Sequence, residues 1–271
     1  MRAQGQKGEA FAALHAGRPF VMPNPWDAGS ARVLAALGFQ ALATTSSGFA
    51  FTLGRPDGNV SLDEAVAHIE GIDRATSLPV SADLENGYGA DPDAAALAVR
   101  RAAEAGAVGA SIEDYDPSGH LYELQHAVER VTAAADAAHA RGFPFMLTAR
   151  AENHIRGNPD LADTIARLEA FEEAGADVLY APGLRTASDV RAVCEAVSLP
   201  VNVLAVPGLS FTDIVAAGAR RISVGGSLTW VAVRAMVAAA ESIRDTGDFS
   251  SLTAAAPFDE AGEFRPAGES K

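Results

Sequence analysis

Two acidic side chains beside a glycine-rich turn offer the clearest chemistry in the sequence. Residues 79–89 read PVSADLENGYG, in which Asp83 and Glu85 follow a short apolar run and precede a Gly-Tyr-Gly turn. Two carboxylates at the open end of a strand suit a hard divalent cation such as Mg²⁺. The alternative is that Asp83 caps the next helix and Glu85 is solvated, and this stretch alone does not separate the two interpretations.

The elements that must position these acids follow a repeated pattern along the chain. A helical stretch that ends in glycine precedes a β-like run several times, and Ser-Leu-Pro-Val occurs at 77–80 and at 198–201. Glycine caps a helix readily, and proline begins a strand without needing a ladder donor. Counting the β-like runs predicts eight strand cores at 20–22, 41–44, 80–82, 110–112, 145–148, 178–180, 201–204 and 222–224.

Eight strands that alternate with helical patterns are typical of a single-domain α/β protein with the (β/α)₈ TIM-barrel fold. A doubly wound open sheet is the structural alternative, but no GxGxxG follows the first strand. We predict an N-terminal segment and helix over 1–18, the barrel over 19–245 and a tail over 246–271. The apolar run 228–238 either packs on its own barrel as the eighth helix or crosses to a neighbouring subunit.

A candidate metal site lies at the C-terminal ends of the predicted strands, where (β/α)₈ barrels place their chemistry. Asp83 and Glu85 follow the third strand and Glu113 follows the fourth. Three carboxylates that converge there would repel one another, and a divalent cation would remove that repulsion. We expect Mg²⁺, with Mn²⁺ as the other possible ion. The alternative is that Glu113 or Asp114 forms a structural ion pair with Arg150.

Groups that suit an anionic substrate lie at the same end of the predicted barrel. Arg150, after the fifth strand, offers a planar fork for a carboxylate or a phosphonate. Ser46, Ser47 and Gly48, after the second strand, offer hydroxyl groups and accessible N–H groups for a second anionic end, unless they form an ordinary serine-rich turn. Asn202, in the seventh strand, is a further polar group that we expect in the substrate site.

Composition restricts the classes of partner. The chain has 271 residues, of which 48% are apolar, and its net charge of -14 argues against non-specific binding to nucleic acid. The single cysteine, Cys194, excludes an intrachain disulfide and fits a reducing cytoplasm. We see neither a signal-peptide pattern nor an apolar run of the ~20 residues that cross a bilayer. We therefore expect a cytoplasmic protein with a small-molecule substrate and no membrane partner.

Five motifs in a fixed order make the chain resemble the isocitrate lyase / phosphoenolpyruvate mutase superfamily. The resemblance covers most of the chain, and each motif alone would be ordinary. The five segments are Ser47-Gly48-Phe49, Leu53-Gly54-Arg55-Pro56-Asp57, Asp83-Leu84-Glu85-Asn86-Gly87-Tyr88-Gly89, Ile112-Glu113-Asp114 and Ala149-Arg150-Ala151-Glu152-Asn153.

The resemblance implies a role for each acidic position. Asp83 would ligate Mg²⁺ directly, and Glu85 and Glu113 would act through metal-bound water. Asp57 would lie near both the metal and the substrate. The glutamate at position 85 departs from the family motif, which has aspartate there, and its longer side chain would shift the water structure.

The resemblance also implies a substrate and a reaction. The Ser47-Gly48-Phe49 motif would hold a substrate carboxylate through its backbone, and Arg150 would bind anionic groups. Family members act on small 2-hydroxy or 2-keto carboxylic acids through an enolate that Mg²⁺ stabilises as a Lewis acid. We therefore predict a Mg²⁺-dependent lyase that cleaves C–C bonds or decarboxylates. The alternatives are P–C bond chemistry, as in phosphoenolpyruvate mutase or phosphonopyruvate hydrolase, and a non-catalytic barrel that binds a small acid.

The loop after the fourth strand departs from the family pattern. Lyases of the family carry a catalytic cysteine there and phosphonate-handling members carry Lys-Thr-Asn, whereas residues 115–121 read YDPSGHL. His120 is a candidate acid/base because histidine titrates near neutrality, unless it is a solvated loop residue. Tyr88 is a second candidate, unless it packs on its own turn. Because family members commonly form homotetramers through a C-terminal helix, the resemblance also implies a homo-oligomer, either a dimer or a tetramer.

Overall fold

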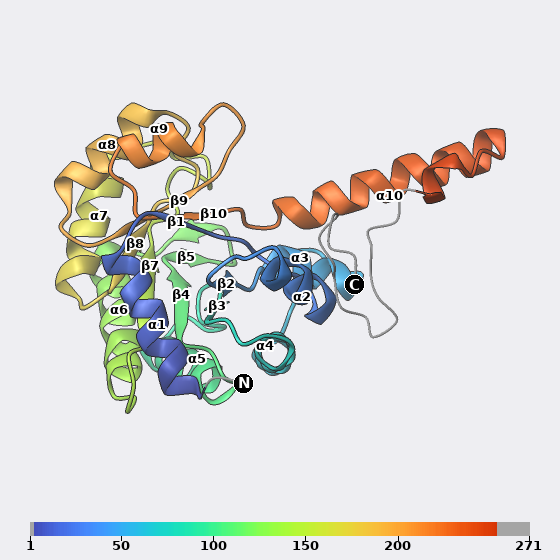
Figure 1. Ribbon diagram of the computed structural model, residues 1–271. Helices are drawn as coiled ribbons and strands as arrows, with labels where there is room; N and C mark the ends of the chain where they lie inside the picture. Colours follow the sequence, from blue (N-terminus) through green and yellow to red (C-terminus); the bar gives the residue numbers. More distant parts are fainter. Residues whose placement is uncertain (1–2, 254–271) are drawn as a thin grey trace.

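Eight parallel strands form one sheet that curls into a nearly closed barrel with helices around it (Figure 1). The computed structural model describes residues 3–253, so most of the tail predicted for 246–271 lies outside the described residues. The strands follow the order β1-β10-β9-β8-β7-β4-β3-β2 around the sheet. Their bounds are β1 (Phe20–Met22), β2 (Leu42–Ala43), β3 (Val80–Asp83), β4 (Gly109–Glu113), β7 (Met146–Arg150), β8 (Val178–Tyr180), β9 (Val201–Leu204) and β10 (Arg221–Ser223). The predicted (β/α)₈ barrel is confirmed.

The two ends of the sheet, β1 and β2, meet at a seam that loop groups bridge. The N–H of Ala43 donates to the carbonyl of Pro23 at 3.1 Å, just beyond β1. Asn24 Nδ2 donates to the carbonyl of Thr44 at 3.0 Å, and its Oδ1 accepts from the backbone N–H groups of Val224 and Gly225, at 3.0 and 2.9 Å. One buried amide thus joins the segments after β1, β2 and β10, so the barrel is held together where ladder pairing ends.

Three strands run farther at their C-terminal ends than the sequence predicts, and the extra length places site residues on the sheet; β3 ends at Asp83. β4 ends at Glu113 and β7 ends at Arg150, and the two residues are partners in the parallel register. Alternate residues of a barrel strand face the interior. Ser111 and Glu113 on β4, and Arg150 on β7, line the cavity inside the barrel. The carboxylate and the guanidinium are therefore fixed by backbone pairing, not by loops.

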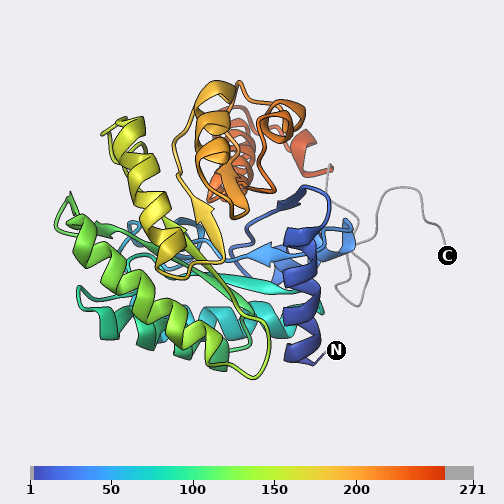
Figure 2. The ribbon, with the colours of Figure 1, turned by 90° about the vertical axis from the view of Figure 1, so that its left-hand side faces the viewer.

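Helices cover the outside of the barrel, and α5 and α6 pack side by side along it (Figure 2). Asp27 caps α2 by accepting from the N–H of Ser30 at 2.6 Å, and aspartate is among the residues that favour this position. Within residues 3–253, no helix is long and apolar enough to cross a membrane. The helix bounds are α1 (Gln4–Ala16), α2 (Ala28–Ala36), α3 (Ser46–Thr52), α4 (Leu62–Ala75), α5 (Pro92–Glu104), α6 (Leu124–His139), α7 (Leu161–Glu173), α8 (Ala187–Ala196), α9 (Phe211–Ala216), α10 (Ser227–Thr246) and the 3₁₀ turn η1 (Ser250–Thr253).

Helix α1 closes the N-terminal end of the barrel, opposite the candidate site. Phe11 is fully buried and packs with Phe20, Met22 and Val108 in one apolar cluster. Lys7 of the same helix is buried and donates to Asp73 Oδ1 at 2.6 Å. This arrangement covers the floor of the barrel, and the interior cavity lies toward the C-terminal ends of the strands.

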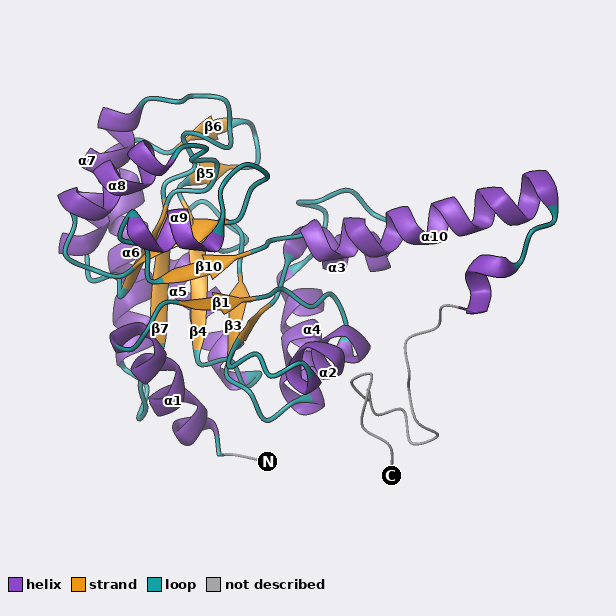
Figure 3. Ribbon diagram, turned by 45° about the horizontal axis from the view of Figure 1, so that its top comes forward, coloured by secondary structure: helices purple, strands orange, loops and turns teal. Residues whose placement is uncertain are grey.

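Helix α10 departs from the usual barrel plan because it projects away from the body (Figures 1 and 3). Its first turn contacts the body: the rings of Trp230 and Phe51 lie 5.4 Å apart. Farther along, Val231 and Met236 are 64% and 59% exposed. Of the two placements predicted for residues 228–238, packing as the eighth barrel helix is therefore wrong, and the helix is free to meet a neighbour.

Candidate active site

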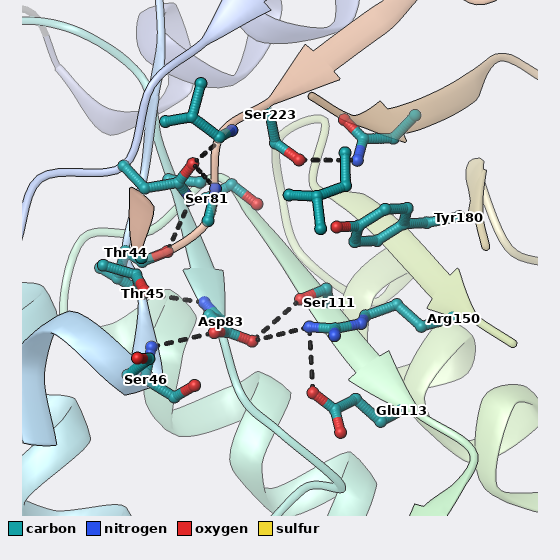
Figure 4. A pocket seen from close by; sticks show the side chains of 18 of the residues that line it. Thr44, Thr45, Ser46, Ser81, Asp83, Ser111, Glu113, Arg150, Tyr180 and Ser223 are labelled. Carbon is teal, nitrogen blue, oxygen red and sulfur yellow. Dashed lines mark hydrogen bonds and ion pairs between the residues drawn. The ribbon is translucent and has the colours of Figure 1, made fainter. Parts of the chain in front are cut away.

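A cavity of about 240 Å³ opens at the C-terminal ends of the strands (Figure 4). Most residues that the sequence singled out line it, namely Ser46, Ser47, Asp57, Asp83, Glu113, Arg150 and Asn202. Three others line a smaller adjoining cavity, namely Phe49, Glu85 and Tyr88. Gly48 and His120 line neither of these two cavities.

Arg150 lies at the centre of the acidic cluster and contacts three carboxylates (Figure 4 shows two of them). Its Nη1 lies 3.2 Å from Asp83 Oδ1 and 3.0 Å from Glu113 Oε1, and its Nη2 lies 2.9 Å from Glu152 Oε1. The ion pair that the sequence offered as an alternative to a metal site is therefore present for Glu113. Asp114 instead pairs with Arg167 at 3.1 Å, behind the cavity.

Asp83 is held in the cavity and does not cap the following helix. Its Oδ2 accepts from the backbone N–H of Ser46 at 3.0 Å, and Ser111 Oγ lies 3.5 Å from its Oδ1. The N-cap of α5 is Asp91. Asp83 is thus anchored by α3, β4 and β7 together, and the helix-capping interpretation of the opening motif is wrong.

A second guanidinium, that of Arg156, forms ion pairs with Glu113 and Glu152 and was not predicted. It lies 3.0 Å from Glu113 Oε2 and 3.2 Å from Glu152 Oε2, and it stacks over the Tyr115 ring at 4.0 Å. The ring belongs to a hairpin of β5 (Tyr115–Asp116) and β6 (His120–Leu121). The only signal in the sequence was the four-residue spacing from Glu152, which is ambiguous outside a helix.

The acids at the open end of the cavity, which we call the mouth, are only partly balanced by positive charge, and the pKa values of Glu85 and Glu113 are raised. Burial, together with Asp83 and Asp57, raises the pKa of Glu85 to about 7. Burial is also the main reason that the pKa of Glu113 is raised to about 8, despite Arg150. Both pKa values lie near neutral pH. Each carboxyl group can therefore exchange a proton there, and its ionised form can bind a cation.

The donor set of the mouth fits a divalent cation such as Mg²⁺. All available ligands are oxygens, as hard cations require, and Glu85 Oε1 is buried without a hydrogen-bond partner among the described residues. Within residues 3–253, however, no three such side chains are already gathered around one point. Arg150, which occupies the space between Asp83 and Glu113, accounts for this separation. A cation would have to compete with this guanidinium for both carboxylates.

Mg²⁺ should raise the melting temperature more as the pH rises through about 7 and about 8, where Glu85 and Glu113 titrate. Both pKa values are raised on folding, so each group's contribution to stability is present below its unfolded pKa and is lost as pH rises through the folded pKa. Once ionised, Glu85 and Glu113 repel Asp83 and other nearby carboxylates, and a bound divalent cation would neutralise this repulsion. Thermal melts across this range, with and without MgCl₂ at matched ionic strength, test this; a Mg²⁺ effect that is flat or falls with pH contradicts it.

The serine-glycine segment is the start of helix α3 and is less accessible than predicted. The N–H of Gly48 is 3.4 Å from the capping Thr45 Oγ1, and the residue is buried against Thr229 and Trp26. The expectation that the Gly48 N–H is accessible to substrate is therefore wrong. Ser46 and Ser47 do line the cavity. Phe49 points elsewhere and stacks on the ring of His68 at 3.9 Å.

The two candidate acid/base residues occupy different environments. Tyr88 is half-buried beside Glu85 with φ 60°, and burial raises the pKa of its hydroxyl. A raised pKa keeps the phenol protonated, so it can donate a hydrogen bond. His120 is exposed on the β5–β6 hairpin, where its Nδ1 lies 3.0 Å from Ser118 Oγ. The structure thus favours the interpretation of His120 as a solvated loop residue.

The floor of the cavity is polar, and the sequence predicted only Asn202 among its residues. Asn202 is buried, as its Nδ2 donates to Ser223 Oγ at 2.9 Å and its Oδ1 accepts from Arg221 Nε at 2.9 Å. Arg221 lines the cavity and was missed. A period-two count along Arg221-Ile222-Ser223 would have placed Arg221 and Ser223 on the same inward face.

Comparison with known proteins agrees with this geometry. The family model for phosphoenolpyruvate phosphomutase matches residues 11–244 of the chain. An oxaloacetate decarboxylase from Rhodopseudomonas palustris (strain BisB18) is 32% identical over 234 residues, which cover 80% of this chain and 78% of the relative. The 2-methylisocitrate lyase of Escherichia coli (strain K12) is 31% identical over 205 residues, which cover 72% of this chain and 68% of the relative.

Comparison with solved structures finds the same overall fold in proteins described as lyases, mutases and hydrolases. A Burkholderia cenocepacia J2315 protein, described only provisionally as a lyase/mutase, is 51% identical, with a TM-score of 0.91 over 94% of this chain and 93% of that one. A phosphonopyruvate hydrolase in complex with oxalate and Mg²⁺ shares the fold, with a TM-score of 0.82 and 24% identity over 93% and 91% of the two chains. With the family model spanning the whole barrel and two enzymes matched at 30% identity or more, the chain belongs to the phosphoenolpyruvate mutase / isocitrate lyase superfamily.

Proposed function

We propose that the protein is a Mg²⁺-dependent lyase that cleaves or decarboxylates a small 2-hydroxy or 2-keto carboxylic acid through an enolate. The observation that supports this most directly is the charge pattern of the mouth. Four carboxylates, those of Asp57, Asp83, Glu113 and Glu152, line one small cavity together with three guanidinium groups, of which Arg150 and Arg156 form ion pairs with these acids and Arg221 lies on the floor. Relatives named as an oxaloacetate decarboxylase and a 2-methylisocitrate lyase support the class of substrate.

Asp83, Glu85 and Glu113 are the residues that we propose would hold the cation. When bound, Mg²⁺ would supply Lewis-acid stabilisation of the oxygen that becomes negative in an enolate. The phosphonopyruvate hydrolase relative, whose structure contains oxalate and Mg²⁺, supports this choice of ion. The Oε1 of Glu85 is buried without a hydrogen-bond partner among the described residues, which leaves this oxygen available to a cation.

Arg150 and the Ser46-Ser47 end of α3 are the groups that we propose for the substrate carboxylate. Arg150 divides its N–H groups among three carboxylates. Neutralisation of Asp83 and Glu113 by a cation leaves that guanidinium with Glu152 and with spare donors for substrate. Tyr88 is positioned to donate a proton or hydrogen bond near Glu85, and it is a better candidate than the exposed His120.

A thermal-shift titration with oxalate, which resembles the pyruvate enolate, tests the proposal. We expect oxalate to raise the melting temperature only when Mg²⁺ is present, because the two ligands would bind together. Turnover of a panel of 2-hydroxy and 2-keto acids should then show C–C cleavage or loss of CO₂. Mg²⁺-dependent binding without any turnover would instead identify a non-catalytic barrel that binds a small acid.

P–C bond chemistry is a second candidate because the matching family model is that of phosphoenolpyruvate phosphomutase. The same cation and anion groups would serve an enolate that is formed by loss of a phosphoryl group. Release of phosphate from phosphonopyruvate, with no turnover of the carboxylic acid panel, would favour this candidate over the first.

We also propose that the protein is a homo-oligomer in which α10 packs on a neighbouring subunit. The exposed apolar side chains of this projecting helix support the proposal, since burying them stabilises an assembly. The double variant Val231→Asp, Met236→Asp should therefore shift the protein from an oligomer to a monomer in light scattering after size exclusion. Leu37→Asp, at a position that is 53% exposed on the barrel body, is the matched control. A monomeric wild type, or a double variant that stays oligomeric, contradicts the proposal.

A further inference from the structure

Arg221, the first residue of β10, places a guanidinium on the floor of the cavity. The residue is only 2% exposed. Its Nε donates to Asn202 Oδ1 and its Nη2 donates to Thr148 Oγ1, both at 2.9 Å, and its Nη1 lies 3.2 Å from His15 Nε2. These contacts fix the side chain inside the barrel but use only part of its hydrogen-bonding capacity, because a guanidinium carries five N–H groups.

All three partners of Arg221 are neutral. His15 Nδ1 lies 2.8 Å from the carbonyl oxygen of Phe11, so the ring proton sits on Nδ1 and Nε2 accepts from Arg221. Burial and the nearby Arg221 lower the pKa of His15 to about 3, which keeps the ring uncharged. Within residues 3–253, no carboxylate forms an ion pair with Arg221. The charge of Arg221 is therefore uncompensated by the described chain.

The contrast with the mouth indicates what would compensate it. Arg150 and Arg156 are surrounded by acids, whereas Arg221 faces the same cavity without one. A buried cation without a counter-charge is unfavourable, and neutral side chains could have made the same three hydrogen bonds. An anionic group that enters the cavity would supply the missing charge.

The spacing along β7 suggests the size of the ligand. Arg221 contacts Thr148, which precedes Arg150 by two residues on the same strand. Two residues of a strand rise by about 7 Å, so the guanidinium of Arg221 contacts a residue one inward-facing layer below the one from which Arg150 extends. A short diacid with one anionic end in each layer would meet both.

We propose that Arg221 binds the second carboxylate of a short dicarboxylic substrate whose first carboxylate lies beside Arg150. This rests on the proposed function for the mouth and adds a specificity-determining residue to it. The substrate would extend into the barrel, and monocarboxylic acids of the same length would bind poorly because they leave Arg221 without a counter-charge.

Calorimetric titrations with succinate and butyrate test the proposal, because the two probes differ only in the second carboxylate. Wild type should bind succinate at least ~10-fold more tightly than butyrate, and Arg221→Met should bring that ratio close to one. Arg191→Met, which removes an exposed arginine from α8, is the matched control and should keep the wild-type ratio. Oxalate with Mg²⁺ is titrated in parallel as a probe of the mouth alone.

A folded Arg221→Met protein that keeps the wild-type preference for succinate overturns the proposal. Should this variant not fold, Arg221→Gln removes the charge but keeps a polar side chain beside Asn202 and Thr148, and an unchanged preference there overturns the proposal equally. The two proposals fail separately. If the wild-type protein showed no Mg²⁺-dependent binding of oxalate but still preferred succinate through Arg221, the function proposed for the mouth would be refuted. The role of Arg221 would remain.

Discussion

Asp83→Ala should abolish Mg²⁺-dependent turnover and should remove the stabilisation that Mg²⁺ gives with oxalate. We expect kcat/KM to fall by about a thousandfold, which corresponds to about 4 kcal/mol of lost transition-state stabilisation and is of the size expected for losing a metal ligand. Asp83 is the acid on which α3, β4 and β7 converge, through Ser46, Ser111 and Arg150. No neighbouring carboxylate has the same set of contacts, so none can replace it.

The variant should remain folded, which separates a functional effect from a structural one. Arg150 keeps Glu113 and Glu152 as ion-pair partners when Asp83 is removed. Asp93→Ala, at an exposed position in the first turn of α5, is the matched control and should retain full activity. If Asp83→Ala, folded by circular dichroism, kept its Mg²⁺-dependent activity, the assignment of the metal site would be wrong.

The parts of the molecule that the sequence predicted are those in which local patterns and tertiary structure agree. Helix-capping glycines and strand-starting prolines divide the chain into eight units, and parallel pairing then brings strand ends to one edge. Asp83, Glu113 and Arg150 were found this way because each ends a strand. The position of such residues depends on counting strands, which does not require any knowledge of long-range packing.

The residues that the sequence did not reveal depend on contacts between distant segments. Arg156 lies in a loop and reaches Glu113 only because the loop folds back over the mouth. The direction of α10 depends on packing beyond its own sequence, since an apolar helix is compatible with either placement. His120 looked catalytic by residue type, yet its hairpin holds it in solvent.

Arg130 is another residue that the sequence did not reveal, and it holds the backbone of the turn that carries Glu85. It is 1% exposed in α6, and its guanidinium donates to the carbonyls of Asn86, Gly89, Ala90 and Asp91. The preceding backbone is unusual: Glu85, Gly87 and Tyr88 have φ values of 48°, 81° and 60°. Left-handed backbone is unfavourable for residues other than glycine and persists only where the surroundings impose it.

Arg130→Met should lower the free energy of unfolding by about 3 kcal/mol, since hydrogen bonds from a charged donor to one buried and three partly buried carbonyls are lost while methionine keeps much of the packing. Urea denaturation measures this, with Arg191→Met as an exposed control that should stay within about 0.5 kcal/mol of wild type. Mg²⁺-dependent oxalate binding should weaken as well, because the turn would no longer hold Glu85 in its left-handed conformation. A loss below about 1 kcal/mol, with unchanged oxalate binding, would show that the turn keeps its shape without Arg130.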